Sequence, residues 1–265
     1  MSERELLLLE EQVVSLVREI GAEVLARPAP PRFRTLAELR AVFDELDGPL
    51  QQKMRAHLQP LRPSATWADE FESALPTSGE LWAIDALDGA VQYLHGLPHW
   101  CVSVALVRDG APVLAVLHSP TLDETYAATL GGGATRNGAP IAPADKRELI
   151  AAYVATSSPP FVAQKPALVS LAGRSLSAML GTVGAVRNLG AQAWQAADVA
   201  GGRLDAFWQY GADDVNFVGA ALLAREAGAI VSDAAGQPWR AGADSILVAA
   251  PSLHAQLVAV LSSLR

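Results

Sequence analysis

Two aspartates stand at the end of an apolar segment, in the stretch LWAIDALDGAVQYLHGLPHW of residues 81–100. Asp85 and Asp88 follow a strand-like run and precede Gly89, a residue that permits a close backbone turn. Buried carboxylates are unfavourable unless a positive group neutralises them, and a divalent cation with oxygen ligands would do so. The alternative is that Asp85 ends the strand and that Asp88 and Gly89 form an ordinary turn. These residues alone leave both interpretations open.

The first half of the chain, which must position this pair, is predicted to begin with helices and to continue with strands. Helical spacing predicts helices over 3–26 and 35–61, separated by the proline-rich segment RPAPPRFR. From residue 81 the apolar pattern changes to that of strands, and the turn dipeptides Asp109-Gly110 and Asn137-Gly138 lie between them. The predicted strands occupy 81–85, 100–110 and 112–120, and residues 124–141 supply another strand and the Asn137-Gly138 turn. Together they predict an antiparallel meander.

The second half alternates between strands and helices. Strand patterns occupy 149–157 and 203–209, and alanine-rich helical patterns that end at glycine occupy 190–202 and 215–228. This alternation predicts an α/β half. We therefore expect one domain, 1–265, made of a lobe of helices and meander (1–145) and an α/β lobe (146–265), with the acidic loop between them.

Composition narrows the class of protein. The chain has 265 residues, of which 51% are hydrophobic, which is enough for one large domain or two lobes. A net charge of -8 and a pI near 5.1 argue against a nucleic-acid partner, because phosphate backbones require clustered Lys and Arg. The single cysteine, Cys101, is interpreted as a buried apolar residue and fits a reducing cytoplasm. No apolar run is long enough to span a membrane, so we expect a cytoplasmic protein without a membrane partner.

Three segments resemble the inositol monophosphatase family, whose members are magnesium-dependent, lithium-sensitive phosphomonoesterases. The family has Asp-Pro-Leu-Asp-Gly-Thr after a strand, and this chain has IDALDGA. The family also has a helix that opens with Trp-Asp and ends with Glu-Ala-Gly-Gly, and the corresponding segment is VNFVGAALLAREAGA. Upstream, GAQAWQAADVAGGRLDAFW is similar to the family's Gly-Ser-Ala segment and Gly-Arg-Leu-Asp strand. The resemblance spans nearly the whole length and implies a layered αβαβα sandwich of the inositol monophosphatase or sugar phosphatase type.

The first signature carries most of the implied ligands. By resemblance, Asp85 bridges two divalent ions, the carbonyl of Leu87 ligates one of them, and Asp88 ligates the other. The N–H groups of Gly89 and Ala90, at a helix start, are expected to hold the substrate phosphate. Two ions suit hydrolysis of a phosphate ester, since one activates a water molecule and one stabilises the leaving oxygen.

Two further acids come from the segments upstream of the signature. Asp47 matches a catalytic aspartate of the family. The family glutamate that binds metal and orients the attacking water falls on Asp69, which keeps the charge on a shorter side chain. Glu70 or Glu72 substitutes for it if the alignment is shifted.

Four positions depart from the family pattern. Ala90 replaces a threonine that contacts metal and water, and a water-orienting group is typically worth about 10²- to 10⁴-fold in rate. Asn216 replaces an aspartate ligand, so Mg²⁺ is expected to bind weakly and Mn²⁺ better. Ala191 and Gln209 replace a serine and a glutamate of the substrate site, which makes inositol itself doubtful as the substrate.

The neighbours of Asn216 allow two interpretations. Either Asp213 or Asp214 replaces the missing ligand, or Asp214 caps a helix that begins at Val215. The resemblance therefore implies a metal-dependent phosphomonoesterase of reduced or altered activity, acting on a small sugar, inositol or nucleotide phosphate. The alternative is a catalytically inactive relative that serves as a binding or regulatory protein. A homodimer is expected, as is common in the family. His95 and His99 receive no role, and the glycines at 131–133 are interpreted as a structural turn.

Overall fold

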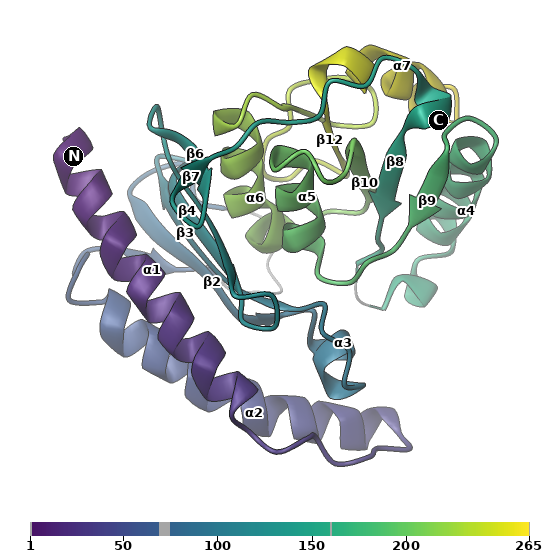
Figure 1. Ribbon diagram of the computed structural model, residues 1–265. Coiled ribbons are helices and arrows are strands. Elements are labelled where there is room, and N and C mark those ends of the chain that lie inside the picture. Colours follow the sequence, from purple (N-terminus) through teal and green to yellow (C-terminus); the bar gives the residue numbers. More distant parts are fainter. Residues whose placement is uncertain (1, 69–74, 160, 265) are drawn as a thin grey trace.

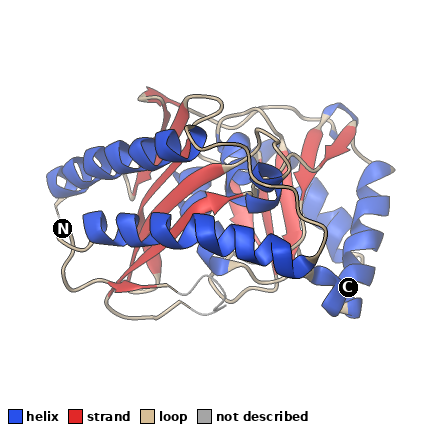
Figure 2. Cartoon of the chain, turned by 90° about the horizontal axis from the view of Figure 1, so that it is seen from below, coloured by secondary structure: helices blue, strands red, loops and turns tan. Residues whose placement is uncertain are grey.

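The computed structural model describes residues 2–68, 75–159 and 161–264, and its helices and sheets form stacked layers (Figure 1). The first layer is a pair of long helices, α1 (Glu3–Leu25) and α2 (Leu36–Leu58). Figure 2 shows both helices lying across the strands. The sequence predicted both to within three residues at each end.

The second layer is a seven-stranded sheet in the order β1-β2-β3-β4-β5-β6-β7. Only the pairing of β1 with β2 is parallel, and the other neighbours run antiparallel, so the predicted meander is confirmed. The strands are β1 (Thr66–Trp67), β2 (Glu80–Asp88), β3 (Cys101–Arg108), β4 (Ala111–Ser119), β5 (Glu124–Thr129), β6 (Gly133–Arg136) and β7 (Ala139–Pro140).

The second half of the chain forms a five-stranded sheet in the order β11-β12-β10-β8-β9. In it β8, β9 and β10 run parallel to one another, whereas β12 is antiparallel to both of its neighbours. The strands are β8 (Tyr153–Thr156), β9 (Ala185–Arg187), β10 (Ala206–Tyr210), β11 (Ile230–Ser232) and β12 (Ser245–Ala249). The remaining helices are α3 (Ala90–Leu94), α4 (Pro166–Leu180), α5 (Gln192–Ala200), α6 (Asp214–Glu226) and α7 (Pro251–Ser262), with short 3₁₀ turns η1 (Leu149–Ala151) and η2 (Val162–Gln164).

Helices α5 and α6 lie between the two sheets. Helix α6 packs on β2 to β6 of the first sheet and also on β11 of the second, while α5 packs on α6 and β10. On the outer faces, α1 and α2 cover the first sheet, and α4 and α7 cover the second. The order of layers is therefore αβαβα, as the resemblance implied. The division into lobes 1–145 and 146–265 stays a prediction, since the middle helices belong to one half in sequence and pack against both.

The first sheet is covered on both faces, and β2 shows how its residues divide. Leu81 and Ala83 belong to the core shared with α5 and α6, whereas Trp82 and Ile84 belong to the core beneath α1 and α2. Successive side chains of a strand point to opposite faces, so each core takes every second residue. Burial on both faces explains why β2 is apolar throughout and not alternately apolar and polar.

The boundaries that differ from the prediction include the starts of β8 and α6. The predicted strand 149–157 begins as the 3₁₀ turn η1, and the strand itself starts at Tyr153. Helix α6 begins at Asp214, not Val215, so the prediction that Asp214 caps it is wrong. Asp214 is the first helical residue, and its carboxylate accepts a hydrogen bond from the backbone N–H of Gly242 at 2.6 Å.

Helix α2 runs through Pro49 without ending there. The preceding residue is Gly48, which has no Cβ to clash with the proline ring, so helical backbone is accessible at this position. None of the helices in the described ranges is long and apolar enough to cross a membrane.

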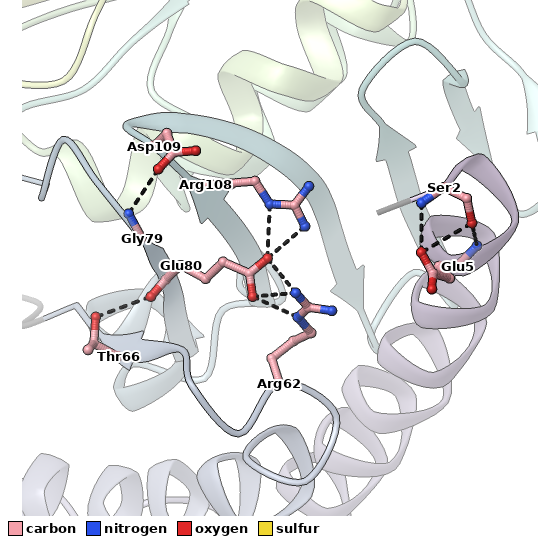
Figure 3. Close-up of polar contacts among 8 residues, drawn as sticks. All are labelled: Ser2, Glu5, Arg62, Thr66, Gly79, Glu80, Arg108 and Asp109. Atoms are coloured by element: carbon pink, nitrogen blue, oxygen red, sulfur yellow. Dashed lines mark hydrogen bonds and ion pairs between the residues drawn. The ribbon is translucent and has the colours of Figure 1, made fainter.

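A half-buried glutamate fixes the start of β2 (Figure 3). The Glu80 carboxylate pairs with Arg62, which follows α2, and with Arg108 at the end of β3, each at 2.6 Å. The two guanidinium groups hold the pKa of Glu80 below its usual range against the opposing effect of burial. The strand that carries Asp85 and Asp88 is thereby anchored at its opposite end.

The glycine turn at 131–133 is also held by a carboxylate. The backbone N–H groups of Gly131 and Gly133 donate to Glu226, at the end of α6, at 2.8 and 2.9 Å. These donors are occupied by the protein itself, which agrees with the prediction that the turn is structural.

Candidate active site

A cavity of about 290 Å³ lies where the two halves of the chain meet. Its walls are the end of β2, the start of α3, the residues that follow β8 and β9, and the first turns of α5 and α6. The carboxyl ends of parallel strands and the N-termini of helices are both common positions for ligand sites. Asp85 and Asp88 line this cavity together with Asn216.

A β-bulge places the two aspartates on one side of the strand. In a regular strand, residues three apart point to opposite faces. Here Asp85 pairs with Ser103 and Asp88 with Cys101, so β2 has one residue more than β3 over this interval. Ala86 and Leu87 both lie in the core beneath α1 and α2, and the extra residue returns Asp88 to the side of Asp85.

Gly89 makes the turn that follows. Its φ of 92° lies in the left-handed region, and a Cβ at this position would stand 2.8 Å from the backbone oxygen of His99. A side chain would therefore be strained by both conformation and space. Helix α3 begins immediately afterwards at Ala90, so the expected helix start is present.

Asp88 is bound by the second half of the chain. Its carboxylate accepts a hydrogen bond from the N–H of Ala193, in the first turn of α5, at 3.0 Å. The residue that precedes α5 is Ala191, which has no side chain to cap the helix, so Asp88 takes that role across the cavity. Asp88 is thus a strand residue with a long-range partner, and the interpretation of an ordinary turn is wrong.

The surroundings of Asp88 favour its neutral form unless a cation is present. Burial, with a smaller effect of the Asp213 charge, raises the pKa of Asp88 to about 7, and the N–H groups of Ala193 and Gln192 partly oppose this. The Cys101 thiol lies 3.7 Å from the same carboxylate. Burial and the nearby carboxylates raise the pKa of this thiol well above its usual value, so Cys101 is buried and protonated.

Asn216 is 8% exposed and is oriented by Asp213, the residue before its helix. Its Nδ2 donates to Oδ1 of Asp213 at 2.8 Å. Its Oδ1 has no hydrogen-bond partner among the described residues, and neither has Oε1 of Gln192, a second residue of the cavity wall.

Of the other expected residues, Leu87, Gly89, Ala90 and Ala191 also line the cavity. The walls do not include Asp47 and Gln209. Asp47 is buried in α2, which packs on β2, and burial raises its pKa. Gln209 is buried in β10, where its side chain acts on Asp213 and favours the charged form of that carboxylate. Asp69, Glu70 and Glu72 lie outside the described residues.

The oxygen atoms that line the cavity are of the types that bind divalent cations. Hard cations prefer carboxylate, amide and carbonyl oxygens, and the cavity has two buried carboxylates beside amide oxygens without partners. A cation would also relieve the unfavourable burial of Asp88. Within residues 2–68, 75–159 and 161–264, however, no three His, Cys, Asp or Glu side chains converge as a metal cluster.

Sequence reasoning missed four polar residues of the cavity wall. Ser157 and Ser158 follow β8, Asn188 follows β9, and Gln192 is the first residue of α5. A usable signal was present, because polar residues directly after neighbouring parallel strands meet at one edge of the sheet. The prediction did not include β9, so that edge was not recognised.

Comparison with known proteins matches residues 15–265 to the inositol monophosphatase family. The chain is 33% identical over 202 residues to an inositol-1-monophosphatase of Rhizobium meliloti, which covers 75% of each chain. It is 34% identical over 196 residues, 72% of each chain, to the Nus factor SuhB of Pseudomonas aeruginosa. Among solved structures, an IMPase of Thermotoga maritima superposes with a TM-score of 0.82 at 25% identity and 96% coverage of both chains. SuhB of Mycobacterium tuberculosis superposes with a TM-score of 0.81 at 25% identity and 98% coverage of both.

Proposed function

The chain belongs to the inositol monophosphatase family, and from this premise we propose that it is a divalent-metal-dependent phosphomonoesterase of reduced or altered activity. Its substrate class is a small sugar, inositol or nucleotide phosphate. The observation that carries the proposal is the bulge in β2, which turns Asp85 and Asp88 toward one cavity that Asn216 and two helix starts also line.

The residues of the cavity have complementary roles in this proposal. Asp85, Asp88, the Leu87 carbonyl and Asn216 hold Mg²⁺ or Mn²⁺, and Asp69 completes the set. Bound divalent ions would supply an acidified water molecule and positive charge for the phosphate oxygens. The N–H groups of Gly89 and Ala90 bind the phosphate. Asp47, which the cavity wall does not include, has the catalytic role of the family aspartate that it matches.

The departures from the family pattern define what is altered. Ala90 lines the cavity but has no hydroxyl to orient water. Asn216 is neutral, so Mg²⁺ binds weakly and Mn²⁺ more tightly. Ala191 contributes only a methyl group to the cavity wall, and Gln209 is neutral where the family has a glutamate, so the favoured substrate differs from inositol phosphate.

The alternative is a binding or regulatory protein without turnover. The loss of the hydroxyl at Ala90 favours it, and relatives from two bacteria carry the name Nus factor SuhB. In that case the cavity binds a phosphorylated metabolite and does not hydrolyse it. A cytoplasmic location, a homodimer and the absence of a nucleic-acid partner are further proposals, based on composition and on the family.

The test is phosphate release from a panel of phosphate esters with Mg²⁺, with Mn²⁺ and with a chelator. We expect metal-dependent release that Asp85→Asn reduces by at least about 100-fold, because a metal ligand contributes several kcal/mol to the transition state. Asp123→Asn is the matched control, since Asp123 is exposed on the turn before β5 and has a φ of 50° that Asn also adopts.

Two results would contradict the proposed phosphatase activity. Release that is the same with chelator and in Asp85→Asn would exclude a metal-dependent phosphatase. Binding of an ester without release of phosphate would favour the regulatory alternative.

A further inference from the structure

We propose that Asp213 is a positioning residue, which orients the Asn216 amide toward the metal site and supplies the negative charge that Asn216 lacks. The inference rests on the proposed function, because it concerns the same cavity. It implies that Asp213, three residues before Asn216, provides the negative charge that an aspartate at position 216 would have carried.

The contact between the two side chains determines which way the amide points. Nδ2 of Asn216 donates to Oδ1 of Asp213 at 2.8 Å. An amide presents donors at one end and an acceptor at the other, and an ionised carboxylate only accepts. The amide oxygen of Asn216 must therefore turn away from Asp213. This oxygen is buried without a partner among the described residues, in a side chain that lines the cavity with Asp85 and Asp88.

Asp213 does not perform the usual task of an aspartate at its position. It is the residue before α6, where an Asp side chain ordinarily accepts an N–H of the first turn. No such hydrogen bond is made, and the side chain contacts Asn216 instead. Burial raises the pKa of Asp213, and hydrogen bonds from the side chains of Asn216, Gln192 and Gln209 oppose this. Helix capping therefore does not explain this acid.

The charge of Asp213 also reaches the other acids of the site. It is close enough to Asp88 to disfavour the ionised form of that carboxylate. A charge-assisted hydrogen bond to the N–H end of an amide polarises the group and makes its oxygen a stronger ligand. With Asp85, Asp88 and Asp213 ionised, a cation beside Asn216 would experience the same formal charge as in a site with an aspartate at 216.

The contact between Asp213 and Asn216 determines which substitutions could restore an aspartate ligand at position 216. Asn216→Asp alone would place a second carboxylate at the 2.8 Å contact with Asp213, and like charges at such a distance repel. The exchange Asp213→Asn with Asn216→Asp keeps one amide and one carboxylate in contact, and it moves the charge into the cavity. The exchange should therefore succeed where the single change fails.

The experiment measures Mn²⁺ dissociation constants of the full chain by electron paramagnetic resonance, for wild type, both single variants and the double variant. We expect Asp213→Asn to weaken binding about 10- to 100-fold, the usual effect of removing a group that orients a metal ligand. Asn216→Asp alone should not tighten binding, and the double variant should bind at least as tightly as wild type. A metal-free measurement, the unfolding midpoint in chelator, should fall in Asn216→Asp and recover in the double variant.

The control is Asp214→Asn, the same change one residue later. Asp214 binds the backbone of Gly242 instead of a cavity residue, so its replacement should leave the dissociation constant nearly unchanged. The proposal is overturned if Asp213→Asn binds Mn²⁺ like wild type, if Asp214→Asn weakens binding equally, or if wild type binds no Mn²⁺.

Phosphate release from the same proteins separates this inference from the proposed function. If the dissociation constants of wild type and variants follow the expected order but none of the proteins hydrolyses any ester, the role of Asp213 is supported and the phosphatase is rejected. Hydrolysis by wild type combined with unchanged Mn²⁺ binding by Asp213→Asn would reject the role of Asp213 alone.

Discussion

Asp198 shows at the scale of one residue how burial and hydrogen bonding compete. It lies on α5 and accepts a hydrogen bond from the Tyr126 hydroxyl at 2.9 Å, while Arg203 approaches to 3.5 Å. Burial is the largest effect and raises the pKa of Asp198 to about 6, although both partners oppose it. The charged form is therefore less favourable in the folded protein than in the unfolded chain.

The consequence is a stability that falls as pH rises. Between about pH 4 and about pH 6 the folded state retains a proton that the unfolded state has lost, so the free energy of unfolding decreases with pH in this window. Asp198→Asn keeps an acceptor for Tyr126 and removes the titration. We expect its stability relative to wild type to increase over the window, by on the order of 2 kcal/mol, and to stay constant above about pH 7.

Denaturant unfolding across this pH range measures the difference. Asp145→Asn, an exposed site, controls for the loss of one negative charge in general. A difference between Asp198→Asn and wild type that is the same at every pH would contradict the account.

At the scale of elements, the close approach of α1 to the first sheet depends on a glycine. A Cβ on Gly21 would stand 2.8 Å from Cδ2 of His118 and 3.1 Å from Cβ of Pro120. The ring of His118 cannot move freely, because it is buried in β4 and its Nδ1 lies 3.0 Å from both the Thr125 hydroxyl and the Glu124 carbonyl. A larger residue at position 21 would therefore clash with β4, even though alanine has a higher helix propensity than glycine.

Gly21→Ala is expected to destabilise the protein by about 1–2 kcal/mol net, since overpacking outweighs a propensity gain of about 1 kcal/mol. Gly173→Ala is the matched control in α4. A Cβ there meets nothing within 4 Å, so this change should stabilise by about 0.5–1 kcal/mol. Chemical denaturation of both variants measures the two effects. Stabilisation by Gly21→Ala would show that the sheet yields at this contact.

At the scale of the whole molecule, the middle helices join the two sheets into one structure. Helix α6 packs on both sheets, and Asp88 of the first half receives an N–H of α5. Neither sheet can lose this layer without exposing an apolar face to water. The two predicted lobes, 1–145 and 146–265, should therefore unfold together in one cooperative transition.

Calorimetry of two core variants tests this cooperativity. Leu50 lies in α2 and Leu253 in α7, on opposite outer sides of the molecule, and both are fully buried. We expect Leu50→Ala and Leu253→Ala each to lower one shared transition, with a loss of about 2–5 kcal/mol and equal calorimetric and van't Hoff enthalpies. A trace that splits into two transitions in either variant would instead establish two independently folding lobes.

Local patterns in the chain were sufficient to predict the helices α1, α2, α5 and α6 and the meander of β2 to β5. Apolar periodicity and turn dipeptides are properties of neighbouring residues, so they can be recognised without a structure. The family signatures likewise identified Asp85, Asp88 and Asn216 as members of one site, and these three do line one cavity.

Other features depend on contacts between distant segments, which no local pattern contains. Residues 85 and 88 would face opposite sides of a regular strand, and they share a side because the pairing with β3 accommodates an extra residue. The partner of Asp88 lies 105 residues away on α5, and it exists because the chain returns there between the sheets. Asp213 was predicted as a substitute ligand or as no ligand at all. Its partner at 2.8 Å, the Asn216 amide, follows from the side-chain directions at the start of α6, where a buried carboxylate requires donors that only the fold brings within reach.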